Sequence, residues 1–144
     1  MLSVLIRRLH LHVGLPEYQT AGAAGFDLAA SEDVRVEPGA VALVPTGLVI
    51  RVPEGYFLGI FARSSTPLKR GLIVSNGVGV IDSDYCGASD EIKIQVLNVT
   101  RDGVTVKAGD RIAQGLFIPV ARAAWQETRD DLRVGSRGGF GATG

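Results

Sequence analysis

The chain has 144 residues, of which 46% are apolar, and this length and composition fit one globular domain with a buried core. Its 15 basic and 15 acidic residues cancel, so the charge balance implies no basic face for tracking a nucleic-acid backbone and leaves room for a small anionic ligand. One cysteine excludes an intrachain disulfide and fits a reducing compartment.

The amino-terminal segment MLSVLIRRLHLHV carries arginines inside its apolar run, which a signal peptide would not do, and the apolar segments are too short to span a membrane. We therefore expect a cytoplasmic protein without a membrane partner. His10 and His12 share one strand-like stretch, so we expect them on an exposed strand face. Neither an elbow motif nor metal-ligand spacing accompanies them, which disfavours a serine hydrolase or a zinc site.

Short β-type runs, broken by Gly, Pro and Asp, make up most of the chain from residue 41 onward. In EIKIQVL, Ile92, Ile94 and Val96 alternate with polar neighbours, which is the period of a half-buried strand. No segment of twelve or more residues has a strong helical period. The sequence therefore predicts an all-β fold, a jelly-roll-like barrel of short strands with at most one short helix.

The one plausible helix lies in STPLKRGL, with Thr66 as N-cap, a proline at the first helical position and Gly71 at the end. Its first N–H groups and the hydroxyls of Ser64 and Ser65, beside Arg63, would form an anion site. An ordinary capped turn is the alternative, because such caps are common.

The segment GVGVIDSDYCG, residues 77–87, places Asp82 directly after an apolar run at the tip of an expected β-hairpin. A carboxylate held there could orient and deprotonate a water molecule, although a turn aspartate more often caps its own turn. Tyr85 could pack its ring on a sugar or cover a strand edge. Cys86 is interpreted as a small residue near the turn.

The carboxyl-terminal segment GSRGGFGATG, residues 135–144, has five glycines and one large apolar side chain, Phe140. Composition alone predicts a flexible end, which is usually without function. A tail that closes over a flat ligand would, however, use such an aromatic residue as a lid.

Five segments of the chain, in order and spacing, resemble the five motifs of the trimeric dUTP pyrophosphatase (dUTPase) family. They are AGAAGFDLAAS (21–31), ARSSTPLKRGL (62–72), SNGVGVIDSDYCG (75–87), GDRIAQGLFIP (109–119) and GGFGATG (138–144). The resemblance covers nearly the whole chain, including the lead-in LPEYQTAG, and five motifs in sequence are far more specific than one.

The resemblance implies a β-clip or jelly-roll homotrimer whose active sites are shared between subunits. Residues 1–134 would form the barrel, and residues 135–144 an arm that closes over an active site. The implied reaction is hydrolysis of dUTP to dUMP and pyrophosphate with Mg²⁺ on the triphosphate, which limits uracil in DNA and supplies dUMP for dTMP synthesis. The implied partners are dUTP and further copies of the chain, with no nucleic acid and no membrane.

By position within the motifs, Asp82 is similar to the base that activates the water attacking the α-phosphorus. Tyr85 is similar to the residue that packs on deoxyribose and leaves no room for a 2′-hydroxyl. The implied uracil readers are Asn76 and the backbone of the 76–82 hairpin, with its residues Gly79, Val80 and Ile81. A fixed backbone can match uracil and leave cytosine with unpaired polar groups.

The other motifs imply the remaining contacts. Asp27 would reach Mg²⁺ through water only, since Mg²⁺ keeps its waters. Phe140 would stack on uracil when the arm closes, with Gly141 beside it in the substrate site. Phosphate oxygens would be held by Arg63, Ser64, Ser65 and Gln114, as phosphoryl transfer depends on such electrostatic anchoring.

Three departures from the family pattern affect the expected roles. The extra residues ASD (88–90) precede the strand, so the role of Lys93 as a sugar or substrate contact is open. The tail reads GSRGG, so Arg137 is expected as the phosphate-binding cation, with Arg133 as the competitor. Gly115 stands where a bulky apolar residue is usual, which should affect packing more than chemistry.

Two alternatives remain. A dCTP deaminase shares the fold, but its catalytic glutamate position, three residues before Asn98, is Gln95 here. A non-catalytic nucleotide-binding module is favoured by the altered tail and disfavoured by the presence of Asp82, Tyr85 and the phosphate-motif residues.

Overall fold

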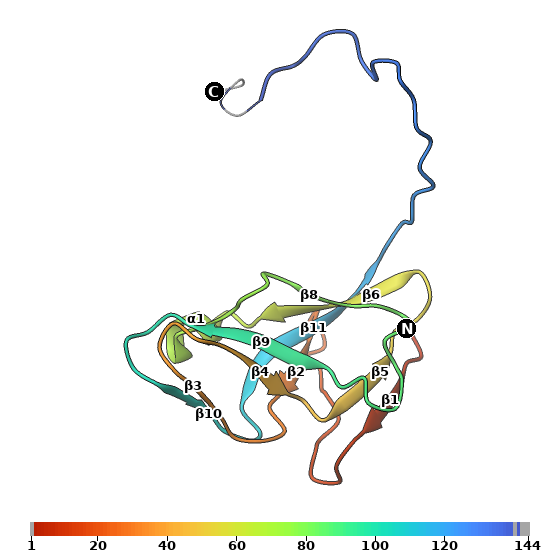
Figure 1. The fold of residues 1–144 in the computed structure, drawn as a ribbon. Coiled ribbons are helices and arrows are strands. Elements are labelled where there is room, and N and C mark those ends of the chain that lie inside the picture. The colour runs from red at the N-terminus through yellow and green to blue at the C-terminus, as the bar shows by residue number, and fades with distance from the viewer. Residues whose placement is uncertain (1, 140, 142–144) are drawn as a thin grey trace.

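The computed structural model describes residues 2–139 and 141, and this part of the chain forms eleven strands and one short helix (Figure 1). In chain order the elements are β1 (Leu5–Arg8), β2 (Phe26–Ala29), β3 (Val34–Val36), β4 (Val41–Pro45), β5 (Leu48–Arg51), β6 (Tyr56–Ala62), α1 (Ser65–Arg70), β7 (Leu72–Val74), β8 (Gly79–Ile81), β9 (Lys93–Asn98), β10 (Val104–Val106) and β11 (Arg111–Pro119).

The strands pair antiparallel and form four sheets within the described residues. The largest has the order β2-β11-β6-β8, the second has the order β4-β9-β7, and β1-β5 and β3-β10 form two-stranded sheets. Figure 1 shows the sheets wrapped around a common interior, with α1 at the end near β3. The predicted all-β barrel with at most one short helix is therefore confirmed.

The interior is filled by the inward positions of the alternating strands. Ile92, Ile94 and Val96 are fully buried, as the alternation predicts, and Lys93 between them is exposed. Burying one such apolar side chain contributes about 1.5–3 kcal/mol relative to leaving it in water. The core thus holds the strand ends, where the polar motif residues lie, in fixed positions.

Gly115 is required by its neighbours in the largest sheet. It lies opposite Phe26 on β2, and a Cβ atom at this position would be 2.6 Å from Phe26 Cζ and 3.1 Å from Leu58 Cδ1. The ring of Phe26 therefore fills the space that a bulky residue at 115 would need. The expectation that Gly115 acts through packing is confirmed.

The prediction of Thr66 as N-cap is wrong, because α1 begins at Ser65 and its N-cap is Ser64. Thr66 is buried, and its hydroxyl donates a 2.7 Å hydrogen bond to the carbonyl of Ile112 on β11. A hydroxyl used for this tertiary contact cannot cap its own helix. Gly71 does end the helix as predicted, with φ of 63° in the left-handed region.

The expected 76–82 hairpin is also wrong as a ladder of two paired strands. β7 pairs with β9 and β8 pairs with β6, so the turn at 75–78 carries the chain from one sheet to another. Two short β-type runs around a turn look alike in sequence whether or not they pair, because pairing is decided by neighbouring strands. β8 is last in its sheet, so one of its backbone edges faces no strand in the described part.

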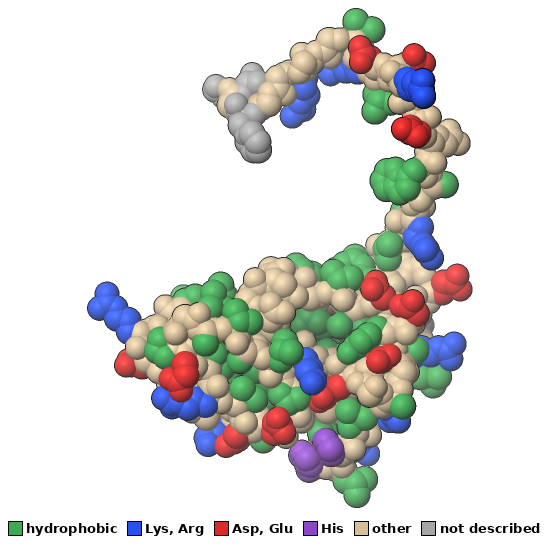
Figure 2. Space-filling view, viewed as in Figure 1, with side chains coloured by type: hydrophobic (Ala, Val, Ile, Leu, Met, Phe, Trp, Pro, Cys, Tyr) green, Lys and Arg blue, Asp and Glu red, His purple; other side chains and the backbone are tan. Residues whose placement is uncertain are grey.

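The two histidines lie beyond a strand and not on it. β1 ends at Arg8, and His10 and His12 occupy the following bend and turn, where their rings stack with centroids 5.5 Å apart. They are exposed, as expected, and form the purple patch in Figure 2.

The carboxyl-terminal segment leaves the barrel after β11. β11 ends at Pro119, and residues 120–139 follow as an exposed segment without strand or helix. Trp125, Leu132 and Val134 are 92%, 91% and 96% exposed. Figure 2 shows open space between this segment and the barrel. Across residues 2–139, no helix has the length and apolar character needed to cross a membrane.

Candidate active site

One cluster of predicted site residues lies where β8 ends. Asp82 follows β8 directly and is exposed, and the N–H of Tyr85 donates to the Asp82 carbonyl at 3.2 Å, which closes the turn. These two residues share a cleft of about 280 Å³ with Lys93. The whole lining, hereafter the Asp82 cleft, is Leu43, Val80, Ile81, Asp82, Tyr85, Glu91 and Lys93.

Tyr85 is held in the Asp82 cleft by its hydroxyl, which donates to the carbonyl of Glu91 at 3.2 Å. The residue remains 40% exposed, so its ring keeps a surface open to a ligand. Lys93 Nζ lies 4.0 Å from Glu91 Oε2, and Glu91 Oε1 accepts from the N–H of Gly47 at 2.8 Å. The lining is thus fixed to the barrel on two sides.

The additional residues 88–90 do not move Lys93 out of the cleft. The N–H of Gly87 donates to Asp90 Oδ2 at 2.6 Å, and the Arg7 guanidinium donates to the Ala88 carbonyl. This insertion therefore folds as a local turn against β1. The structure brings Asp82, Tyr85 and Lys93 together despite the departure in sequence.

The expected uracil readers lie on the turn and edge strand before Asp82. Asn76 is exposed in the turn, and a Cβ atom on Gly79 would be 3.0 Å from the Ile60 side chain and 3.8 Å from Asn76 Nδ2. Gly77 has φ of 73°, which favours glycine. The outer edge of β8 presents N–H and C=O groups that face no strand in the described residues, so they are able to read a planar base.

A second cluster lies at the far end of the same sheet and consists of ion pairs. Asp27 on β2 accepts from Arg63 Nε at 2.7 Å and from Arg111 Nη1 at 3.1 Å. Gln114 lies opposite Asp27 in the β2-β11 ladder and donates from Nε2 to the Ala62 carbonyl at 3.1 Å. The set Asp27, Arg63, Arg111 and Gln114 is called the Asp27 cluster below.

The two serines of the second motif border the Asp27 cluster through Arg63. Ser64 is exposed and makes no side-chain capping hydrogen bond to α1 within the described chain, and Ser65 is half-buried at the first helical position. Ser64 directly follows Arg63, whose Nη1 donates to the Arg111 carbonyl at 3.1 Å. A hydroxyl donor and a guanidinium are thus adjacent on one surface.

The sequence analysis missed three residues around the Asp27 cluster: Arg111, Gln19 and Asp110. Arg111 Nη1 also donates to Gln19 Oε1 at 2.6 Å. Asp110 Oδ2 accepts from Arg70 Nη1 at 2.6 Å and from the Lys107 N–H at 2.9 Å, and the guanidinium holds the pKa of Asp110 below its ordinary value. Asp110 thereby ties α1 to the turn before β11. The letters GDR carried this signal, because Asp110 directly precedes β11, the strand of Gln114, and Arg111 is its first residue.

Among residues 2–139 and 141, no group of three or more His, Cys, Asp or Glu side chains lies close enough to hold a metal ion. Asp27 is 11% exposed and carries an arginine on each oxygen. This donor set fits a hydrated Mg²⁺ that a triphosphate brings, and it does not fit a dedicated protein cage.

The Asp82 cleft and the Asp27 cluster are far apart in one chain. In the β6-β8 ladder Ile81 lies opposite Leu58, so Asp82 falls beside Phe57, whereas Arg63 follows the other end of β6. The six residue-to-residue steps from 57 to 63 span roughly 20 Å at about 3.3 Å per step. The Asp82 cleft and the Asp27 cluster are therefore built from well-separated parts of the same sheet.

None of the described arm residues lines the Asp82 cleft or belongs to the Asp27 cluster. Arg133, Arg137 and Gly141 are exposed, and Phe140 lies outside the described residues. The choice between Arg133 and Arg137 therefore stays a prediction. Gln95, at the position of the deaminase glutamate, donates from Nε2 to Ser75 Oγ at 2.9 Å.

Comparison with known proteins gives consistent results. A family model described as dUTPase matches residues 12–144. The deoxyuridine 5′-triphosphate nucleotidohydrolase of Wolinella succinogenes is 42% identical over 145 residues, covering 99% of this chain and 95% of the relative.

Among solved structures, the dUTPase from Streptococcus mutans is 41% identical with a TM-score of 0.74, over 77% of this chain and 89% of that one. The Staphylococcus bacteriophage 80alpha dUTPase G164S mutant, solved with dUpNHpp, is 23% identical with a TM-score of 0.85, over 99% and 98% of the two chains. At 23% identity, the match to the bacteriophage protein shows that the two chains share a fold.

Proposed function

The chain belongs to the dUTPase family and hydrolyses dUTP to dUMP and pyrophosphate, and from this premise we propose which residues perform each part of the reaction. Asp82 is the general base. Its carboxylate accepts a proton from a water molecule, the water oxygen bonds to the α-phosphorus, and the bond from that phosphorus to the bridging oxygen breaks. Pyrophosphate leaves with the electron pair. The supporting observation is that Asp82 is fixed by a closed turn at the rim of a cleft.

The substrate is selected beside Asp82. The outer edge of β8, with Gly79, Val80 and Ile81, and the turn residue Asn76 bind uracil by backbone and amide groups. Tyr85 packs on the deoxyribose, since its hydroxyl is occupied by Glu91 and its ring is open to the cleft. Lys93 lies in the same lining and contacts the substrate. Efficient cleavage of UTP by the wild type would contradict the role of Tyr85.

The triphosphate is held by Arg63, Ser64, Ser65 and Gln114, next to Asp27. The family acts on the magnesium complex of the nucleotide. Asp27 would hold the hydrated Mg²⁺ through water, and the ion would supply positive charge beside the phosphate oxygens. In the structure described here Asp27 neutralises Arg63 and Arg111, which keeps the cationic groups in place before the substrate arrives.

A complete site requires two copies of the chain, one with its Asp82 cleft and one with its Asp27 cluster. The separation of about 20 Å along β6 carries this proposal. An apolar face adjoins the cleft: Val41 and Leu43 on β4 are 57% and 54% exposed, and Ile73 on β7 is 37% exposed. Figure 2 shows apolar side chains gathered on this side of the barrel. A second copy seated there would bury the face and complete the cleft, as in a homotrimer.

The arm completes the proposed site. Arg137, Phe140 and Gly141 close over a nucleotide bound between two barrels, and residues 120–139 already extend away from their own barrel. The single unpaired cysteine, Cys86, agrees with a cytoplasmic location.

Subunit complementation tests the shared site. Asp82→Asn and Arg63→Gln are each expected to inactivate every site of their own homotrimer. Mixed trimers, assembled from equal amounts of the two variants after dissociation, should recover about a quarter of wild-type turnover. A site then works only when the subunit that supplies Asp82 is the Arg63→Gln variant and the subunit that supplies Arg63 is the Asp82→Asn variant, and each condition is met about half the time. No recovery, with mixed trimers confirmed by mass spectrometry, would show that one chain supplies both residues.

A further inference from the structure

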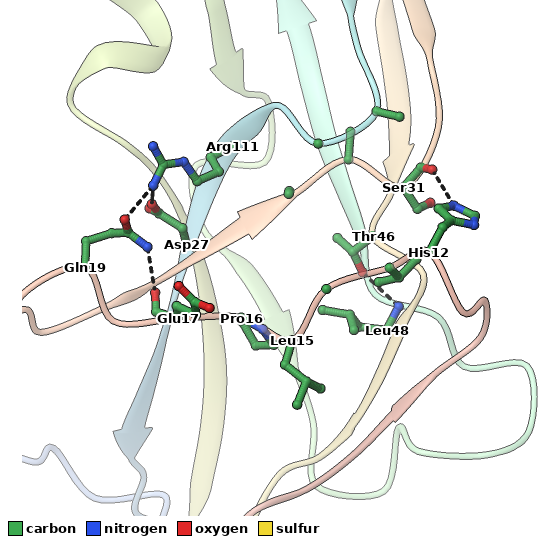
Figure 3. A pocket seen from close by; sticks show the side chains of 16 residues that line it. His12, Leu15, Pro16, Glu17, Gln19, Asp27, Ser31, Thr46, Leu48 and Arg111 are labelled. Atoms are coloured by element: carbon green, nitrogen blue, oxygen red, sulfur yellow. Dashed lines mark hydrogen bonds and ion pairs between the residues drawn. The ribbon is translucent and has the colours of Figure 1, made fainter.

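Arg111 contacts the residue assigned to Mg²⁺, yet no motif role was assigned to Arg111. Its Nη1 lies 3.1 Å from Asp27 Oδ2 and 2.6 Å from Gln19 Oε1 (Figure 3). Gln19 comes from the segment that precedes β2, so three separate parts of the chain meet at this guanidinium. Figure 3 shows Arg111 and Gln19 directed toward Asp27 at one wall of a cleft of about 430 Å³.

A register shift in β11 puts Arg111 on this face. Gln114 lies opposite Asp27, and residues three apart in an unbroken strand point to opposite faces. The ladder is irregular between Arg111 and Ala113, so Arg111 lies opposite Ala29, two residues from Asp27 and on its face. Ile112, in the shift, is fully buried. Such bulges redirect side chains next to functional sites.

Asp27 has two cationic partners, one on each carboxylate oxygen. Arg63 Nε holds Oδ1 at 2.7 Å, and Arg111 holds Oδ2. Arg63 is also the residue proposed to bind phosphate, and a guanidinium that turns to a phosphate gives up part of its contact with Asp27. A carboxylate that is 11% exposed is costly to leave without a cation. Arg111 then remains as the partner that keeps Asp27 oriented.

We propose that Arg111 is a positioning residue, which holds Asp27 by Oδ2 while Arg63 moves from Oδ1 to the triphosphate, so that Oδ1 faces the hydrated magnesium of the substrate. The inference rests on the proposed role of Asp27. Gln19 orients Arg111 from the other side. The expected consequence is specific: loss of Arg111 weakens the contribution of magnesium to nucleotide binding and leaves the metal-independent part nearly unchanged.

The test is calorimetric binding of a non-hydrolysable imido analogue of dUTP to the intact protein, with magnesium and with EDTA. The variants are Arg111→Gln, Arg111→Lys and Gln19→Ala, with Arg101→Gln as a matched control, because Arg101 is exposed in the turn after β9. The ratio of the affinity with magnesium to the affinity with EDTA should be about 10 to 100 times smaller in Arg111→Gln than in wild type. This is the usual effect of losing a residue that orients a metal-binding side chain. Affinity in EDTA should stay within about threefold.

Arg111→Lys should recover part of the magnesium effect, and Gln19→Ala should lose a smaller part of it. Equal magnesium effects in Arg111→Gln and wild type would overturn the inference, as would an equal loss of affinity with and without magnesium, which would make Arg111 a direct phosphate ligand. Since Gln19 is exposed, its variant keeps the test valid if Arg111→Gln does not fold.

Asp82→Asn, measured in parallel, separates this inference from the catalytic assignment. It should bind the analogue with the wild-type magnesium effect, because the proposed role of Asp82 is to accept a proton from the attacking water and not to hold the metal. A wild type without any magnesium effect would overturn the metal role of Asp27 and this inference with it, and would leave the role of Asp82 to its own assay.

Discussion

The Asp27 cluster and the Asp82 cleft lie at opposite ends of one sheet and differ in how far each is assembled in a single chain. In the first, Asp27 already carries two arginines, and Gln114 bonds to the Ala62 carbonyl. In the second, Asp82 and the outer edge of β8 face solvent beside an apolar surface. The charged groups proposed to bind phosphate are thus held in place before a ligand arrives, whereas the proposed base is exposed and, in our proposal, is enclosed only by substrate and a second subunit.

The largest expected effect comes from a substitution in the Asp82 cleft. Asp82→Asn keeps the shape and removes the base, so kcat should fall by ~10²–10⁴. Steady-state release of pyrophosphate from dUTP measures this, and binding of the imido analogue serves as the control. Turnover within a factor of about two of wild type would remove Asp82 from the chemistry.

Removal of residues 135–144 tests whether catalysis at the Asp82 cleft depends on the arm. Turnover should fall roughly tenfold or more, because the proposed cation and stacking ring are lost, while the oligomer persists. Light scattering reports the oligomer, and the dUTP assay reports the rate. An unchanged rate would remove Arg137 and Phe140 from the site, and a monomeric product would show that the arm holds the subunits together.

The Asp27 cluster can be disturbed through the packing of the strands that carry it. Gly115→Ala brings a Cβ atom to 2.6 Å from Phe26 Cζ, which should lower the free energy of unfolding by about 1–3 kcal/mol. Gly22→Ala is the matched control, since nothing lies within 4 Å of its Cβ position. Urea unfolding at equal protein concentration measures both variants. Phe26→Leu combined with Gly115→Ala should recover part of the loss, and additive losses would contradict this account.

The smallest effect concerns acid stability beside the Asp27 cluster. Arg70 lowers the pKa of Asp110, and a carboxyl with a lowered pKa stabilises the fold above its unfolded-state pKa and loses that contribution as pH falls through the folded pKa. Asp110→Asn should therefore cost about 0.5 kcal/mol at pH 7 and less below about pH 4. The urea unfolding midpoints of wild type and Asp110→Asn, at pH 7 and below about pH 4, measure this cost. A cost that grows on acidification would contradict the assignment.

Much of the fold and of the candidate site was predictable because it depends on local pattern. The alternation around Ile94 identified a core strand, and Gly71 identified the end of α1. The five motifs brought Asp82, Tyr85 and Arg63 into consideration by residue type and order. The sequence did not predict which strands pair or which distant groups a side chain bonds to. Thr66 bonds to β11 instead of capping α1, and β7 and β8 lie in different sheets.

The sequence by itself determined the all-β class and the family and predicted the reacting groups, because residue types, their period and their order along the chain are local properties. The tertiary structure alone decided that Asp82 and Arg63 stand at opposite ends of β6, that a register shift turns Arg111 toward Asp27, and that the extra residues 88–90 leave Lys93 in place. These are matters of strand register and packing between distant segments, and no local pattern encodes which edges meet.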